Sequence, residues 1–247
     1  MTARTGPADR RATLGEHGTP PVLLVLGSML SLQFGAAIAT KLFDEVGAAG
    51  ASALRLGLAA VVLVLWARPA VRSWSSAHRR SVVLLGLSMA AMNAAFYEAV
   101  SRIPLGAAIT IEFLGPLGLA VALTRRLREL VFVALALAGV ALLGLGQQGS
   151  VDGALDPIGV LAALIAAFFW ACYILTGSRL ATTEPGLDGL AGACVVAALV
   201  VVPVGVASSG RELLDARVLL LGLAMAVLAS VVPYSFEIRA LERMAKR

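Results

Sequence analysis

The sequence predicts an all-helical bundle that crosses a membrane several times, and three observations carry this prediction. Hydrophobic residues make up 59% of the 247 residues and charged residues only 14%, whereas a soluble domain carries about 25% charged residues. The mean hydropathy is +0.90, and the apolar residues form long continuous blocks. A chain with so little polar surface cannot cover itself in water, so we expect a polytopic integral membrane protein in contact with the lipid bilayer.

Eight apolar runs are each long enough to form a membrane-spanning helix, because a hydrocarbon core of about 30 Å needs about 20 helical residues. We place them at residues 21–40, 48–66, 81–100, 104–123, 130–146, 157–177, 189–207 and 218–238. Residues 1–20 are polar and precede the first run as a tail. The connections are short, so consecutive helices should lie antiparallel and adjacent.

The distribution of basic residues predicts the orientation in the membrane. With the N-terminus inside, fifteen of the 20 Lys and Arg residues fall in inside segments and four fall in outside loops, while Arg55 lies within a span. Because cytoplasmic loops carry an excess of Lys and Arg, both termini, including the tail 1–20, are predicted to be cytoplasmic.

Composition and spacing argue against several other classes of protein. The net charge of +5 comes from short basic clusters between apolar runs, not from one basic face, so we expect no nucleic-acid partner. Cys172 and Cys194 lie within apolar runs at no metal-binding spacing, so neither a metal nor a cofactor is expected. The histidines, His17 and His78, lie outside the spans, and no phosphate-binding motif is present, so we expect no enzyme.

Two short segments indicate an internal repeat. The sequence A-V-S-R-I-P (residues 99–104) is similar to A-L-E-R-M-A (residues 240–245), and five predicted spans separate them. An odd number of spans inverts the second copy, which is typical of inverted-repeat transporters. We predict a first five-helix repeat over residues 21–146 and a second repeat over residues 157–247. The second repeat is truncated to three helices, because the chain ends where a ninth span should begin and the counterpart of the Glu112 helix is absent.

Several segments carry a family resemblance: L-Q-F-G-A-A-I-A (32–39), A-L-R-L (53–56), F-Y-E (96–98), I-P-L-G (103–106), I-E-F-L-G-P (111–116), W-A-C-Y-I-L-T-G-S-R (170–179) and V-P-Y-S-F-E-I-R-A-L-E-R (232–243). With these segments the chain resembles the drug/metabolite transporter superfamily of EamA type, and in particular the bacterial threonine/homoserine exporters. The resemblance implies ten helices in two five-helix repeats, a central cavity and alternating access in the bacterial cytoplasmic membrane.

Arg55 and Glu112 are the leading candidates for a substrate-binding cavity. A mid-span arginine costs about 2.5–3.5 kcal/mol on insertion scales, and intramembrane charges usually mark function. Both residues lie about eight residues from the outer ends of their spans, or about 12 Å deep at 1.5 Å per residue. We therefore predict that they share an interior polar site or form an ion pair. The alternative is that each is satisfied separately, Arg55 by extending its side chain toward the outer interface.

Pro116 strengthens the case for a ligand near Glu112. It lies one helical turn further along the same stripe, which also contains Ala108, and it frees a backbone carbonyl. An α-amino acid carries an ammonium and a carboxylate, so a buried Glu and Arg would complement it. The alternative is a packing helix kinked by proline, with no ligand.

Other polar and aromatic residues are weaker candidates. Gln33 and Asn93 either line the cavity or form hydrogen bonds between helices. Trp170 and Tyr173 either pack in the core or line the cavity, as the resemblance implies. Glu237 is expected to be solvated near the cytoplasmic end of the last span, after a kink at Pro233 and Tyr234.

Three residues near the predicted outer interface are candidates for an outer gate: Tyr97, Glu98 and Arg102. Aromatic and charged anchors are ordinary at this depth, so an anchoring role is the first interpretation and gating the alternative.

The resulting functional prediction is export of a small molecule, either a small amino acid similar to threonine and homoserine or a related metabolite. A truncated homologue that does not transport, and persists as a membrane-embedded or interacting protein, is the alternative. If the chain transports, a second copy would have to supply the missing helices, which predicts a homodimer.

Overall fold

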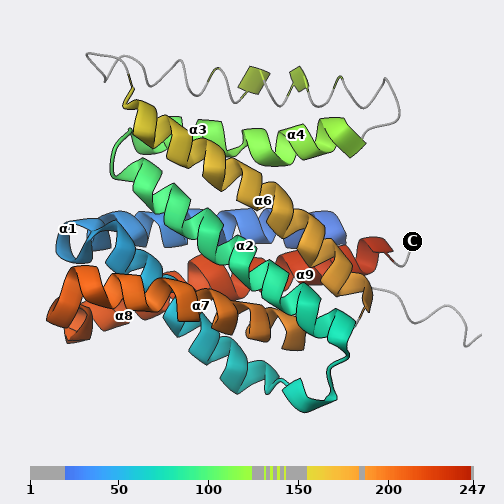
Figure 1. Cartoon of the computed structure of the whole chain (residues 1–247). Coiled ribbons are helices and arrows are strands. Elements are labelled where there is room, and N and C mark those ends of the chain that lie inside the picture. The colour runs from blue at the N-terminus through green and yellow to red at the C-terminus, as the bar shows by residue number, and fades with distance from the viewer. Residues whose placement is uncertain are drawn as a thin grey trace, which may run out of the picture.

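The computed structural model describes residues 20–123, 155–183 and 187–245, with a few positions between 131 and 142. Within these residues the chain is helical and has no strand, so the predicted all-helical class is confirmed (Figure 1). The helices are α1 (Pro21–Ala67), η2 (Val71–Ser73), α2 (Ser76–Val100), α3 (Leu105–Glu112), α4 (Leu114–Leu123), α6 (Pro157–Thr183), α7 (Asp188–Ser209), η4 (Gly210–Leu214), α8 (Ala216–Ala226), η5 (Val227–Val231) and α9 (Val232–Ala245).

In the described part of the chain, 6 helical segments are long and apolar enough to cross a membrane. The first is α1, which bends sharply and covers both predicted spans 21–40 and 48–66. The segments Leu105–Leu123 and Ala216–Ala240 each combine shorter helices. Most of the predicted span 130–146 lies outside the described residues.

The bend in α1 occurs at Gly47, where φ is 65° and ψ is 179°. Side chains other than hydrogen are strained in this backbone region, which explains why glycine is required there. The hydroxyl of Ser209, at the end of α7, donates to the carbonyl oxygen of Val46 at 2.6 Å. Gly47 divides α1 into a first leg, residues 21–46, and a second leg, residues 48–67. The first leg thus ends at Val46, beyond the predicted end at residue 40.

The core is built by the second leg of α1 together with α2, α6, α7 and α9. Small residues allow very close helix approaches. A Cβ added at Gly35 on α1 would lie 2.5 Å from the Cβ of Ala229, and one at Gly205 on α7 would lie 2.2 Å from that of Ala53. Because such distances are below van der Waals contact, a methyl group at either position would push the helices apart.

The connections gather at two ends of the bundle. Figure 1 shows the bend of α1, the start of α8 and the α2–α3 junction at one end, and the chain's C-terminus at the other. Ring packing of Phe43 against Tyr97 at 5.4 Å and an ion pair of 3.4 Å between Arg217 and Glu45 join the connections of the first end. The distribution of basic residues predicts that these connections lie on the outer side of the membrane. The structure contains no membrane, so this orientation stays a prediction.

Candidate functional site

The side chain of Arg55 points from the second leg of α1 into the bundle. Its Nε donates to the hydroxyl of Ser230 at 2.9 Å, and one terminal nitrogen donates to the hydroxyl of Tyr234 at 3.0 Å. The guanidinium is therefore held by neighbouring helices and does not extend along α1 toward the outer interface. Both partners are neutral, so they satisfy hydrogen bonds without cancelling the charge.

The segment that presents Ser230 and Tyr234 is irregular for a definable reason. The residues Val227–Val231 form a turn of π-helix directly before α9, and Pro233 lacks the amide hydrogen that would continue the regular hydrogen-bonding pattern. The hydroxyl of Ser31 on α1 donates to the freed carbonyl oxygen of Leu228 at 2.7 Å. Single π-turns of this kind are frequent at functional sites.

Two residues of α2 complete the surroundings of Arg55. The amide of Asn93 is buried and donates to the carbonyl oxygen of Met89 at 2.8 Å, while its side chain lies within hydrogen-bonding reach of Tyr234. The hydroxyl of Tyr97 lies within reach of Arg55. Tyr97 is only 3% exposed, and its ring packs edge-on against those of Phe43 and Phe96. Its predicted depth near the outer interface stays a prediction.

Glu112 lies at the last residue of α3, half-buried, and Arg55 is within electrostatic range of it. The two side chains form no ion pair in the described structure, where Arg55 is bonded to hydroxyl groups instead. The predicted continuous span 104–123 is interrupted at Phe113. The cause is Pro116, which cannot donate to the carbonyl of Glu112 four residues earlier and whose ring clashes with it.

Sequence reasoning missed a second carboxylate. Glu237 on α9 was expected to be solvated, but it is half-buried and accepts a hydrogen bond of 2.7 Å from the hydroxyl of Tyr173 on α6. The ring of Tyr173 packs against that of Tyr234 with a centroid distance of 5.6 Å. Ser230, Tyr234 and Glu237 follow a spacing of four and three, so they share a face of the last span. This stripe of polar residues on one helix face could have indicated from the sequence that Glu237 points into the bundle.

The structure thus brings together a group of residues that we call the polar core: Arg55, Asn93, Tyr97, Tyr173, Ser230, Tyr234 and Glu237. Trp170 lies one turn from Tyr173 on α6 and packs edge-on against Phe113 at 5.1 Å. Gln33 is exposed on the first leg of α1 and is not part of this group.

Glu98 and Arg102 form a separate, exposed cluster at the junction of α2 and α3. Nε of Arg102 is 2.5 Å from a carboxylate oxygen of Glu98, and a terminal nitrogen is 3.5 Å from Asp156 at the start of α6. The hydrogen bond that Arg102 donates to Glu98, together with the negative charge of Glu98, raises the pKa of Arg102 above its usual value. These residues tie two helix ends together at the surface.

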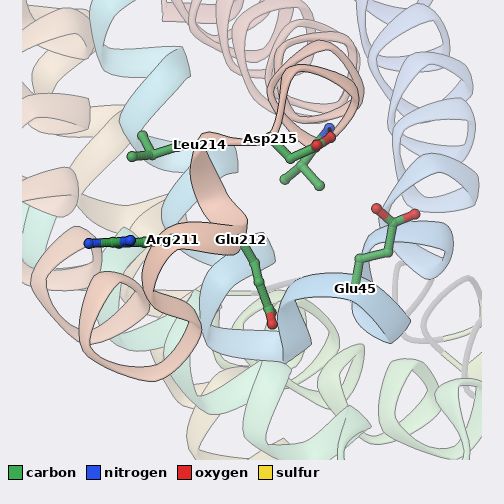
Figure 2. A pocket seen from close by; sticks show the side chains of 6 residues that line it. Glu45, Arg211, Glu212, Leu214 and Asp215 are labelled. Atoms are coloured by element: carbon green, nitrogen blue, oxygen red, sulfur yellow. Dashed lines mark hydrogen bonds between the residues drawn. The ribbon is translucent and has the colours of Figure 1, made fainter.

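A cavity of about 800 Å³ opens at the end of the bundle where α1 bends. Figure 2 shows its wall, to which α1 contributes Glu45 and the η4–α8 region contributes Arg211, Glu212, Leu214, Asp215 and Val218. No member of the polar core lines this cavity. Val218 also belongs to a buried apolar cluster with Leu42, Leu54 and Met225. This cluster includes Tyr97, so it shares one residue with the cavity wall and one with the polar core.

A bundle of membrane-length helices with an arginine and a carboxylate bonded to buried hydroxyl groups has the features of a membrane transport protein. Comparison with known proteins agrees. Residues 157–245 match the EamA-like transporter family. The chain is 40% identical over 228 residues to the threonine/homoserine exporter RhtA of Escherichia coli (strain K12) and to that of Salmonella typhimurium (strain LT2). Each aligned region covers 92% of this chain and 76% of the relative. No solved structure matches significantly.

The chain therefore belongs to the EamA-like transporter family, the EamA-type branch of the drug/metabolite transporters, together with these exporters. The resemblance stated from the sequence is confirmed. The membership makes the protein a membrane transporter for a small molecule, and it agrees with the expectation that the chain is not an enzyme.

Proposed function

We propose that this protein exports small amino acids similar to threonine and homoserine, or related metabolites, across the bacterial cytoplasmic membrane. The identity of 40% to two threonine/homoserine exporters supports the substrate class. The single structural observation that carries the proposal is Arg55, a cation in the bundle interior whose hydrogen-bond partners, Ser230 and Tyr234, are both neutral. An anionic group on the substrate would supply the missing charge.

In this mechanism the substrate carboxylate binds the guanidinium of Arg55, replacing or joining its bonds to Ser230 and Tyr234. Charge-assisted hydrogen bonds of this kind are about twice as strong as neutral ones. In this proposal the apolar cluster around Leu42, Leu54 and Met225 is the closed gate between Arg55 and the cavity at Glu45, because it shares Tyr97 with the polar core and Val218 with the cavity wall. Transport then requires this cluster to open while the opposite end closes, which is alternating access between inverted repeats.

Efflux of labelled threonine or homoserine from cells expressing this chain tests the proposal. We expect efflux above that of cells with an empty vector, and its loss in the variant Arg55→Leu. Absence of efflux from protein that is shown to be inserted in the membrane would overturn the proposal and favour the transport-inactive homologue. The homodimer stays a prediction, which cross-linking of the purified protein in detergent and in lipid would test.

A further inference from the structure

Glu237 is a second charged group in the bundle, and among the described residues no cation is bonded to it. Its carboxylate accepts one hydrogen bond, from Tyr173 at 2.7 Å, and is within electrostatic range of Arg55. No ion pair joins the two side chains in the described structure. The interior of the bundle therefore holds a positive and a negative group that lie within electrostatic range of each other and are each hydrogen-bonded to a different tyrosine.

Each of these charged groups is held by a buried tyrosine. The hydroxyl of Tyr234 accepts from Arg55 at 3.0 Å, the hydroxyl of Tyr173 donates to Glu237 at 2.7 Å, and the two rings pack at a centroid distance of 5.6 Å. Both tyrosines are at most 5% exposed. Because both rings are buried and packed on each other, they fix the positions of the two hydroxyl groups that hold the guanidinium and the carboxylate.

We propose that Glu237, positioned by Tyr173, binds the ammonium group of the substrate while Arg55 binds its carboxylate. Together the two residues would select zwitterionic α-amino acids over analogues that carry only one of the two charges. This inference rests on the proposed function and deepens it. A carboxylate has about four acceptor positions, and Tyr173 occupies one of them. In the proposed complex the other positions accept from the three donors of the ammonium group.

Glu112 is less suited to this task. It is the last residue of α3, at the negative end of the helix dipole, where a carboxylate is disfavoured. No hydrogen bond to its carboxylate is found in the described structure, whereas Glu237 is held by a buried hydroxyl. Because binding groups work best when their own position is fixed by neighbours, Glu237 is the stronger ammonium site.

The experiment uses purified protein in proteoliposomes and measures inhibition of labelled threonine binding by three compounds. They are threonine, its deaminated analogue β-hydroxybutanoate, and threoninol, which lacks the carboxylate. We expect the wild type to prefer threonine over both analogues by about 10- to 100-fold, the range that one hydrogen bond to a charged group supplies. In Glu237→Gln the preference over β-hydroxybutanoate should fall to within about threefold, while the preference over threoninol remains.

Three further variants separate this role from a structural one. Glu237→Asp keeps the charge and should retain part of the preference, and Tyr173→Phe should reduce it by less than Glu237→Gln. Asp44→Asn removes an exposed carboxylate on α1 and should leave all three inhibition constants unchanged.

Two outcomes would overturn the inference while leaving the proposed function intact. One is an equal loss of affinity for threonine and β-hydroxybutanoate in Glu237→Gln, which indicates a purely structural role. The other is loss of the preference in Glu112→Gln but not in Glu237→Gln, which would assign the ammonium site to Glu112. If the wild type itself fails to bind threonine, the proposed function fails first, and the inference falls with it.

Discussion

Arg55 and Arg102 show two ways in which this chain uses an arginine. Arg102 is exposed at the α2–α3 junction and lies against two carboxylates, those of Glu98 and Asp156. Arg55 lies within the bundle and is bonded to two hydroxyl groups, those of Ser230 and Tyr234. The arginine in water thus has anionic partners. In the part of the chain that the structure describes, the hydrogen-bond partners of the arginine in the more costly environment are neutral.

The difference indicates what each site is for. A solvated arginine needs no counter-charge for stability, so its carboxylates serve to connect helix ends. A buried cation without an anion at contact distance keeps part of its electrostatic cost, and a substrate that brings an anion relieves that cost on binding. The hydroxyl groups hold the guanidinium in position and leave its charge available.

The largest expected effect on threonine affinity comes from replacing Arg55, with Arg102 replaced in a separate variant for comparison. Arg55→Leu should lower the affinity for threonine at least about 100-fold, because it removes two charge-assisted hydrogen bonds in a low-dielectric site. The measurement is binding of labelled threonine to protein in proteoliposomes. Arg102→Leu is the matched control, since it makes the same substitution at the surface. Equal losses in the two variants would break the distinction between the sites.

The next effect is expected from removing a hydroxyl group that positions Arg55. Tyr234→Phe keeps the ring that packs on Tyr173 and deletes only the acceptor of the 3.0 Å hydrogen bond. A hydrogen bond to a charged group contributes about 1.5–3 kcal/mol, so we expect threonine affinity to fall about tenfold. Tyr173→Phe serves as the comparison, because it deletes the hydroxyl of the adjacent ring without touching Arg55. An unchanged affinity in Tyr234→Phe would show that the hydroxyl does not position the guanidinium.

A double-mutant cycle tests whether Glu112 belongs to the same site. Arg55→Leu and Glu112→Gln would be made singly and together, and the free energy of unfolding measured for each protein. The residues are within electrostatic range but not bonded, so we expect a coupling of about 1 kcal/mol. A directly bonded pair would give a larger coupling, up to about 3 kcal/mol, and strict additivity would remove Glu112 from the site.

The structural features that could be predicted from the sequence are those with a large energetic cost. Long apolar runs predict membrane helices because no other environment accommodates them, and Arg55 is conspicuous because a charge within such a run is expensive. Pro116 predicts the interruption of its helix for a similar reason, since the backbone hydrogen bond it removes is obligatory.

Residues whose cost is small could not be recognised in this way. Ser230 and Tyr234 are neutral and common in membrane helices, so nothing in the sequence marks them as partners of a residue about 175 positions earlier. Glu237 lies near the end of its span, where solvation is the ordinary interpretation. Its contact with Tyr173 depends on how α6 and α9 pack, which is a tertiary property. The bend at Gly47 was located only approximately, because Asp44 and Glu45 have the composition of a loop although they lie on a helix.

The smallest expected effect lies at the surface cluster of Arg102. Glu98→Gln removes the closer of its two carboxylates, and Arg102 keeps Asp156 at 3.5 Å. Because exposed ion pairs contribute little and are screened by salt, we expect threonine affinity to stay within about twofold of the wild type. Thermal unfolding measured at low and high salt should show any difference between wild type and variant shrinking as salt rises. A large, salt-insensitive loss of transport in Glu98→Gln, with binding intact, would instead indicate that this junction moves during transport and that Glu98 and Arg102 act as an outer gate.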